Sequence, residues 1–232
     1  MGSWVSYALD NGVTQIRLQH GKVNALSHEV FAQLDQALDQ AQQDQAVVIL
    51  SGQPGVFSGG FDLKEMQKSP EAAMALVAVG SQLAHRLAGF PLPVIAACEG
   101  HAIAKGAFLL LSVDHRIGAE GAFRLGLNEV AIGMTMHHAG IAMARHRLSP
   151  AYFHRAVVNA QMFTPQEAVV AGFLDEVVAP DQVQDRALAV AEAFKALNFK
   201  AHAQTKRKAH ADYLAHLAEA IEKDQRHFDL ME

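Results

Sequence analysis

Glu129 is the residue whose type and surroundings most directly suggest chemistry. It is a single carboxylate within a largely apolar stretch, Arg124-Leu125-Gly126-Leu127-Asn128-Glu129-Val130-Ala131-Ile132-Gly133. A carboxylate is costly to bury in its charged form, so such a residue either faces solvent or is retained for a purpose such as proton transfer. Taken alone, the pattern leaves both interpretations open.

Two further stretches place glycines where main-chain N–H groups could meet a ligand. They are Val56-Phe57-Ser58-Gly59-Gly60-Phe61-Asp62-Leu63-Lys64-Glu65-Met66 and Glu99-Gly100-His101-Ala102-Ile103-Ala104-Lys105-Gly106-Ala107-Phe108. Glycine allows close approach to the backbone, and the first N–H groups of a helix have no partner within it. The first stretch is not a P-loop, because no Gly-Lys-Ser/Thr follows. It is not a dinucleotide fingerprint either, because its glycines have the wrong spacing.

The elements that must position these residues begin with a hairpin. Strands are predicted over Val5–Leu9 and Val13–Gln19, joined at Asp10-Asn11-Gly12, because Asn-Gly between alternating runs is a strong hairpin signal. Ser27 is predicted to be the N-cap of a helix. Apolar residues recur along one face of that helix at Val30, Phe31, Leu34, Ala37, Leu38 and Ala41.

The remaining pattern alternates strands and helices. Core strands are predicted at Ala46–Leu50, Val94–Ala97 and His115–Ala119. Helices are predicted over Pro70–Leu87 and from the end of the Gly100–Gly106 connection through Leu111. Two more are predicted, one that begins at the capping box Thr164-Pro165-Gln166-Glu167 and one from about Asp181 onward. This alternation predicts an α/β core whose loops at the strand ends carry the chemistry. The three stretches that contain Gly59-Gly60, Lys105 and Glu129 are predicted to be those loops.

In their order and spacing, the three loops resemble the crotonase (enoyl-CoA hydratase/isomerase) family. The first is similar to that family's Phe-x-x-Gly-x-Asp-Leu segment, the second to Gly-x-x-x-Gly-Gly-Gly, and the third to Gly-Leu-x-Glu-Val-x-Leu-Gly. Lys22-Val23-Asn24-Ala25-Leu26, Asp114-His115-Arg116-Ile117 and the stretch from Thr164 to Val178 resemble further family segments. The resemblance covers roughly Val13 to Val178. It implies a crotonase-like ββα spiral core in residues 1–180, and a C-terminal helical region in 181–232 for trimerisation and pocket closure.

The resemblance also implies a mechanism. In that family two main-chain amides form an oxyanion hole for a thioester carbonyl, and here they belong to Phe61 and Lys105. The family's hydratases use two glutamates; the second falls at Glu129, and the first at Phe108, which cannot transfer a proton. One carboxylate beside an oxyanion hole suits a 3,2-enoyl-CoA isomerase, in which Glu129 takes a proton from C2 and delivers one to C4.

Acyl-CoA contacts follow from the same resemblance, and no metal or separate cofactor is expected because coenzyme A enters as part of the substrate. The expected contact residues are Val23, Ala25, Ser58, Gly60, Phe61, Asp62, Leu63, Lys105, Gly106 and Asn128.

Ala104-Lys105-Gly106 departs from the family's three glycines. Lysine would be strained if its position needs a positive φ, but it can supply the amide equally well if it begins a helix, which we expect. We expect the Lys105 side chain to point to solvent; the alternative is that it lies against the acyl group.

Other functions stay open at this point. A hydratase is possible if groups not evident in the sequence bind water, and the unusual Lys105 and Phe108 also allow a non-catalytic acyl-CoA-binding relative. A serine hydrolase built on Ser58 with His137 or His138 is disfavoured, because Ser58 lacks the Gly-x-Ser-x-Gly elbow. A metal site at the adjacent histidines is disfavoured because neighbouring residues point apart on a helix.

Composition bounds the protein class. Of 232 residues, 50% are apolar and 19% charged, with a formal charge of −5 and no Lys/Arg run typical of nucleic-acid binding. The densest basic cluster, Lys206-Arg207-Lys208, is expected on a solvated helix face, with a phosphate-rich ligand as the alternative. The single cysteine, Cys98, excludes an intrachain disulfide and favours a reducing compartment. Without a recognisable signal peptide or an apolar run of membrane-spanning length, a cytoplasmic protein is predicted, with a homotrimer or pair of trimers implied by the resemblance.

Overall fold

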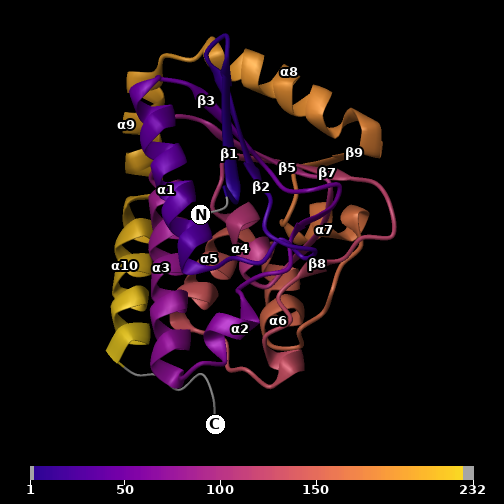
Figure 1. The fold of residues 1–232 in the computed structure, drawn as a ribbon, viewed down its shortest axis with the longest axis vertical. Helices are drawn as coiled ribbons and strands as arrows, with labels where there is room; N and C mark the ends of the chain where they lie inside the picture. Colours follow the sequence, from indigo (N-terminus) through magenta and orange to yellow (C-terminus); the bar gives the residue numbers. More distant parts are fainter. Residues whose placement is uncertain (1–2, 227–232) are drawn as a thin grey trace.

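Two β-sheets and the helices around them make up the fold in a computed structural model, which describes residues 3–226 (Figure 1). The larger sheet has six strands in the order β1-β2-β3-β5-β7-β9, of which only β1 and β2 are antiparallel. Its strands are β1 Val5–Asp10, β2 Val13–Leu18, β3 Val47–Ser51, β5 Val94–Cys98, β7 His115–Ala119 and β9 Glu176–Val178. The smaller sheet is parallel, in the order β4-β6-β8. It consists of β4 Gly55–Ser58, β6 Gly100–Ile103 and β8 Leu125–Gly126.

The helices cover both faces of the larger sheet. They are α1 His28–Gln43, α2 Leu63–Met66, α3 Pro70–Ala88, α4 Lys105–Leu111, α5 His138–Arg147, α6 Pro150–Val157, α7 Pro165–Ala171, α8 Val183–Lys195, α9 Phe199–Ala209 and α10 Ala211–Arg226, with 3₁₀ turns η1 Val130–Ile132 and η2 Pro180–Gln182. One face of the sheet packs in the main core with α1 and α3, and α8 lies across the other face (Figure 1). Because both faces are covered, β3 and β5 are continuous apolar runs rather than alternating ones.

Local sequence signals determine several of these elements. The hairpin is confirmed: Asp10 pairs with Val13, and Asn11 and Gly12 have φ values of 45° and 75°. Ser27 caps α1 by accepting a hydrogen bond from the amide of Val30, and all six apolar residues predicted on one face of α1 are buried. The capping box at the start of α7 is also confirmed.

The small sheet was not predicted. The three stretches expected to be loops each contain a short strand, β4, β6 or β8. These strands pair with one another, and isolated bridges join Val56 to Gln53 and Leu125 to Phe163. They are two to four residues long, and β6 and β8 include glycines, so periodicity gives no signal for them. The sheet aligns the strand ends that lead to Gly59-Gly60, Lys105 and Glu129 on one edge.

Arg116 joins two of the family-like segments. Its guanidinium donates to both carboxylate oxygens of Asp175, and its Nη1 donates to the carbonyl of Gly172 at 2.6 Å. Arg116 is 5% exposed and the Asp175 side chain 32% exposed, so this is a partly buried charge-assisted pair. These two segments therefore hold β7 against the chain that leads into β9, away from the small sheet.

The C-terminal helices pack on the chain's own core. α10 lies against α3 and α5, and both carboxylate oxygens of Asp224 accept from the amides of His138 and Ala139 at the start of α5. The prediction that residues 206–208 lie on a solvated helix face is wrong for Lys206, which is buried and pairs with Asp114 at 2.8 Å. Residues 227–232 of the predicted C-terminal region lie outside the described residues, and trimerisation stays a prediction. None of the helices within residues 3–226 combines the length and apolarity needed to cross a bilayer.

Candidate active site

A cavity of about 160 Å³ lies where the strands of the small sheet end. Its apolar walls include Leu63, Met66, Val77, Ile132 and Met134. Four polar side chains also line it: Asn128, Glu129, Thr135 and His137. Gly59, Phe61 and Ala104 complete it, so all three predicted loops converge on one space.

The first turn into the cavity, at Gly59-Gly60-Phe61, is held by buried polar groups. The Ser58 hydroxyl donates to the carbonyl of Asn24 at 2.9 Å and accepts from the amide of Gly60 at 3.1 Å. Asn24, which has a φ of 54°, donates through its side chain to the carbonyl of Phe57 at 2.9 Å. Ser58 and Asn24 therefore build the turn that precedes Phe61.

The main-chain N–H of Phe61 takes no part in this network. The amide of Leu26 donates to the carbonyl of Gly60 at 2.8 Å, and the amide of Asp62 donates to the carbonyl of Leu26 at 3.0 Å. These two bonds form a parallel bridge between Leu26 and Phe61, and they use the carbonyl of Gly60 and the amide of Asp62. Among the hydrogen bonds of the described residues, none is donated by the Phe61 amide.

The second turn, at Ala104-Lys105, presents another free amide. Lys105 is the first residue of α4, so its N–H has no acceptor within the helix, and no other described residue accepts from it. The expectation that lysine begins a helix here is confirmed. The strained backbone lies one residue earlier, at Ala104, with φ 51° and ψ −122°.

The two turns lie against each other because Gly60 has no side chain. A Cβ on Gly60 would lie 3.1 Å from Cβ of Ala104 and 3.4 Å from the main-chain nitrogen of Lys105, and Gly60 has a φ of 100°. At Gly106, a Cβ would lie 2.3 Å from the carbonyl oxygen of Ser58. Glycine at both positions is therefore what allows the free amides of Phe61 and Lys105 to come from adjoining turns.

Glu129 is buried in the cavity wall with only 7% of its surface exposed. No described residue forms a hydrogen bond to its Oε2. Burial raises the pKa of Glu129 to about 7, and the nearby positive charge of Lys105 acts in the opposite direction. The carboxyl group is thus available to gain or lose a proton near neutral pH.

The expectation that the Lys105 side chain points to solvent is wrong. It is fully buried, and its Nζ lies 6.0 Å from the centroids of both the Phe61 and Phe108 rings. Gly80 in α3 makes the room: a Cβ there would lie 3.0 Å from Cε of Lys105. Burial lowers the pKa of Lys105 to about 7, with Glu129 acting to raise it.

His137 is a cavity residue that the sequence did not single out for this site. It is the N-cap of α5, its ring centroid lies 5.4 Å from that of Phe108, and burial lowers its pKa to about 3. It is therefore neutral at ordinary pH. The Ser58 hydroxyl is engaged with Asn24 rather than with His137, which disfavours the serine hydrolase. Residues 3–226 contain no cluster of three His, Cys, Asp or Glu side chains suited to a metal ion.

The other residues predicted to contact acyl-CoA divide by exposure. Val23 and Leu63 are each 56% exposed, Ala25 is partly buried, and Leu63 and Asn128 line the cavity. Asp62 instead caps α2 by accepting from the amide of Lys64 at 2.9 Å. Gly80 was missed, although a glycine inside a helix costs about 1 kcal/mol relative to alanine and so signals a packing or functional need.

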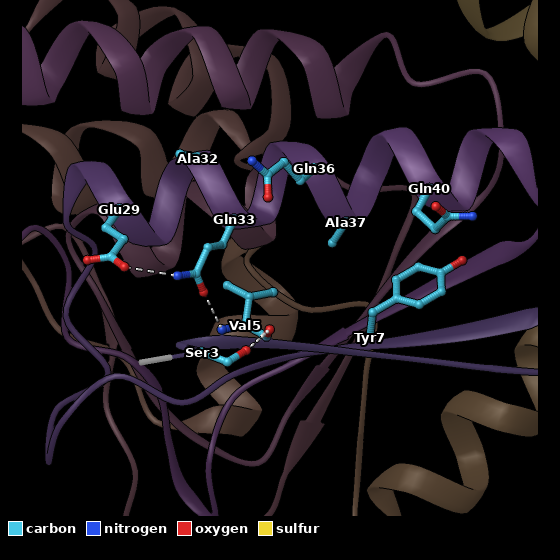
Figure 2. A pocket seen from close by; sticks show the side chains of 9 residues that line it. All are labelled: Ser3, Val5, Tyr7, Glu29, Ala32, Gln33, Gln36, Ala37 and Gln40. Atoms are coloured by element: carbon cyan, nitrogen blue, oxygen red, sulfur yellow. Dashed lines mark hydrogen bonds between the residues drawn. The ribbon is translucent and has the colours of Figure 1, made fainter. Parts of the chain in front are cut away.

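A larger groove of about 630 Å³ lies elsewhere, between the edge strand β1 and α1 (Figure 2). Glutamines line much of it, and the Gln33 side chain accepts from the amide of Val5 (Figure 2) and from that of Trp4. None of the three predicted loops lines this groove. The smaller cavity, where free amides and a buried carboxyl group meet, is therefore the candidate active site.

Comparison with known proteins identifies the family of the chain. The family model for enoyl-CoA hydratase/isomerase matches residues 8–231. A solved enoyl-CoA hydratase/isomerase family protein from Pseudomonas syringae is 56% identical, with a TM-score of 0.96 over 97% of this chain and 98% of that one. A probable enoyl-CoA hydratase of Mycolicibacterium paratuberculosis is 31% identical over 94% of this chain and 86% of its own length. The mitochondrial enoyl-CoA delta isomerase 1 of Mus musculus is also 31% identical, over 90% of this chain and 75% of its own length. The chain belongs to the enoyl-CoA hydratase/isomerase family, and has that family's fold with a helical C-terminal region.

Proposed function

We propose that this protein is a 3,2-enoyl-CoA isomerase, which moves the double bond of a 3-enoyl-CoA into conjugation with the thioester. The proposal rests on the number of carboxylates in the cavity. Within the described part of the chain, Glu129 is the single carboxylate among the lining residues. By resemblance to the family, a hydratase that adds water to the double bond would need two glutamates. Here the other position is Phe108, which is fully buried.

The reaction is a proton transfer in two steps. Glu129 takes a proton from C2, and the electron pair of that C–H bond forms an enolate whose charge lies on the thioester oxygen. The amides of Phe61 and Lys105 donate hydrogen bonds to that oxygen, an arrangement in which one donor is worth about 10²–10³ in rate. Glu129 then delivers its proton to C4, and the double bond finishes between C2 and C3.

The pKa of Glu129 suits both steps. A general base and acid works best when its pKa lies near the working pH, and burial places that of Glu129 at about 7. The apolar walls at Met66, Val77 and Met134 suit an acyl chain. Coenzyme A enters as part of the substrate, and its contacts are expected at the exposed Val23 and Leu63.

The test measures two reactions with one enzyme preparation. A 3-enoyl-CoA should be converted to the 2-enoyl isomer, and in D₂O any Glu129 proton that exchanges with solvent should place deuterium at C2 of recovered substrate and at C4 of the product. Glu129→Gln should reduce conversion by about 10²–10⁴ while acyl-CoA binding persists. Fast hydration of a 2-enoyl-CoA with slow isomerisation would instead establish a hydratase. Binding with no isomerisation, no hydration and no exchange at C2 would establish a non-catalytic acyl-CoA-binding protein.

A further inference from the structure

Lys105 is buried without a structural partner. Its Nζ makes no hydrogen bond with any described residue, and no carboxylate of residues 3–226 lies within ion-pair distance of it. An unpaired buried ammonium is costly. The other buried lysine, Lys206, differs because its Nζ pairs with Asp114 at 2.8 Å. A structural ion pair therefore explains the burial of Lys206 but not that of Lys105.

The surroundings of Lys105 accommodate its length and its charge. Gly80 leaves space for the aliphatic part of the side chain in the middle of α3. The Phe61 and Phe108 rings lie around the Nζ at 6.0 Å, within the range of a cation–π interaction. Phe61 also lines the cavity, so the charge lies directly behind one of the cavity walls.

The sheet brings Lys105 and Glu129 to the same edge. Ile103 of β6 pairs in parallel with Gly126 of β8, and the amide of Ala104 donates to the carbonyl of Gly126 at 2.9 Å. Lys105 follows the end of β6, and Glu129 follows the end of β8. Each group also responds to the other, because the Lys105 charge lowers the pKa of Glu129 and the Glu129 charge raises that of Lys105.

The other groups around Lys105 add no competing charge. His137 is fully buried and stays neutral because its pKa falls to about 3. α3 and α4 contribute Gly80 and Phe108. From α10, Asp224 is bound to the amides at the start of α5. Among the described residues, Glu129 is therefore the acid whose ionisation depends on Lys105.

Building on the function proposed above, we propose that the Lys105 ammonium is a positioning group that balances a single negative charge in two places, on Glu129 before proton removal and on the thioester oxygen afterwards. As the C2 proton moves to Glu129, the carboxylate becomes neutral and the charge passes to the enolate oxygen. That oxygen is bound by the main-chain N–H of Lys105 itself, and the ammonium lies behind the Phe61 ring that lines the cavity. Lys105 neither gains nor loses a proton in these steps, and because its pKa of about 7 leaves it only partly protonated at pH 7, the effect belongs to its ammonium form.

The experiment combines Lys105→Met with a direct titration of Glu129. Methionine keeps the main-chain amide and much of the side-chain volume but removes the charge. Carboxyl ¹³C NMR on protein labelled at glutamate, with the Glu129 signal identified from Glu129→Gln, gives the pKa of Glu129 without turnover. We expect that pKa to rise by about 1 unit or more in Lys105→Met. The acidic limb of the kcat/KM profile, which reports the free enzyme, should move by the same amount. A rise of 1 unit from about 7 should lower kcat at pH 7 about 5-fold, with KM changing less than about 3-fold.

Two further variants make the result decisive. Lys105→Gln is measured in parallel and should shift the same pKa, so the test stands if the methionine variant does not fold. Lys200→Met removes the same charge from an exposed position on α9 and should leave both the pKa and the profile unchanged. An unchanged pKa of Glu129 in the Lys105 variant that folds overturns the proposal, even if the wild type isomerises 3-enoyl-CoA. If the Lys105 variant shifts the pKa of Glu129 but the wild type does not isomerise 3-enoyl-CoA, the isomerase is refuted and the Lys105–Glu129 coupling stands.

Discussion

The main-chain nitrogen of Lys105 lies 3.4 Å from the point that a Cβ on Gly60 would occupy. The two turns that carry the free amides are therefore in contact through a glycine, and their separation depends on the absence of one methyl group. Since the proposed oxyanion hole needs both amides directed at one oxygen, this contact is where its geometry is most sensitive to substitution.

Gly60→Ala is expected to separate the two turns. Alanine there is strained at a φ of 100° and also crowds Ala104 and the amide of Lys105. We expect kcat to fall about 10²-fold or more, as when an oxyanion donor is misplaced. Gly55→Ala is the matched control, because Gly55 has a φ of 83° but nothing within 4 Å of its Cβ position. It should lose stability from the same backbone strain and retain activity; equal losses of activity in the two variants would contradict the proposed role of the contact.

The pH dependence of kcat/KM should report the ionisation of Glu129. Because burial raises its pKa to about 7, the rate constant should increase with pH through that value as the carboxylate forms. An acidic limb near pH 4.5, the ordinary value for a glutamate, would show that a different group acts as the base.

The same raised pKa predicts a stability change with a definite sign. The folded protein holds the Glu129 proton more tightly than the unfolded chain, so its contribution to stability is complete below about pH 4.5 and declines as the pH rises to about 7. Glu129→Gln should therefore raise the free energy of unfolding at pH 8 by about 1–3 kcal/mol, and change it little at pH 4.5. Urea unfolding at the two pH values measures the difference, and an equal effect at both would mean that the carboxyl group is not perturbed.

Lys206→Met should destabilise the fold strongly. It leaves the Asp114 carboxylate, whose side chain is 17% exposed, without its cation, and removing one partner of a buried pair costs about 3–5 kcal/mol. Chemical denaturation of this variant and of Lys200→Met measures the difference in the free energy of unfolding. Lys200→Met is the control and should lie within about 0.5 kcal/mol of wild type. A loss below about 1 kcal/mol would show that the pair contributes little.

Ala104→Gly should stabilise the protein. Glycine relieves the strained backbone at φ 51° and ψ −122°, but it also makes the unfolded chain more flexible. We expect the first effect to be larger, so that the free energy of unfolding rises by about 1 kcal/mol. Ala107→Gly makes the same change inside α4, where it should cost about 1 kcal/mol or more. The two variants should thus shift Tm in opposite directions, and a loss of stability at both positions would refute strain at Ala104.

The sequence by itself determined the features that depend on neighbouring residues. Asn11-Gly12 turns the first hairpin, and the hydroxyls of Ser27 and Thr164 begin helices, because turn and capping groups act on amides only a few residues away. Lys105 was also expected to begin a helix, because only its main-chain amide is required at that position. Resemblance to the family singled out Phe61 and Glu129, both of which line one cavity.

Only the tertiary structure decided the small sheet, the burial of Lys105 and the cavity position of His137. The strands β4, β6 and β8 are too short to show periodicity and form by pairing across the chain. The position of the Lys105 side chain depends on two residues far from it in sequence. Gly80 leaves room for the side chain, and the Phe61 ring packs beside it. Burial and electrostatic environment are properties of residues brought together from a distance, and for this reason the pKa values of Lys105 and Glu129 follow from the fold rather than from either local motif.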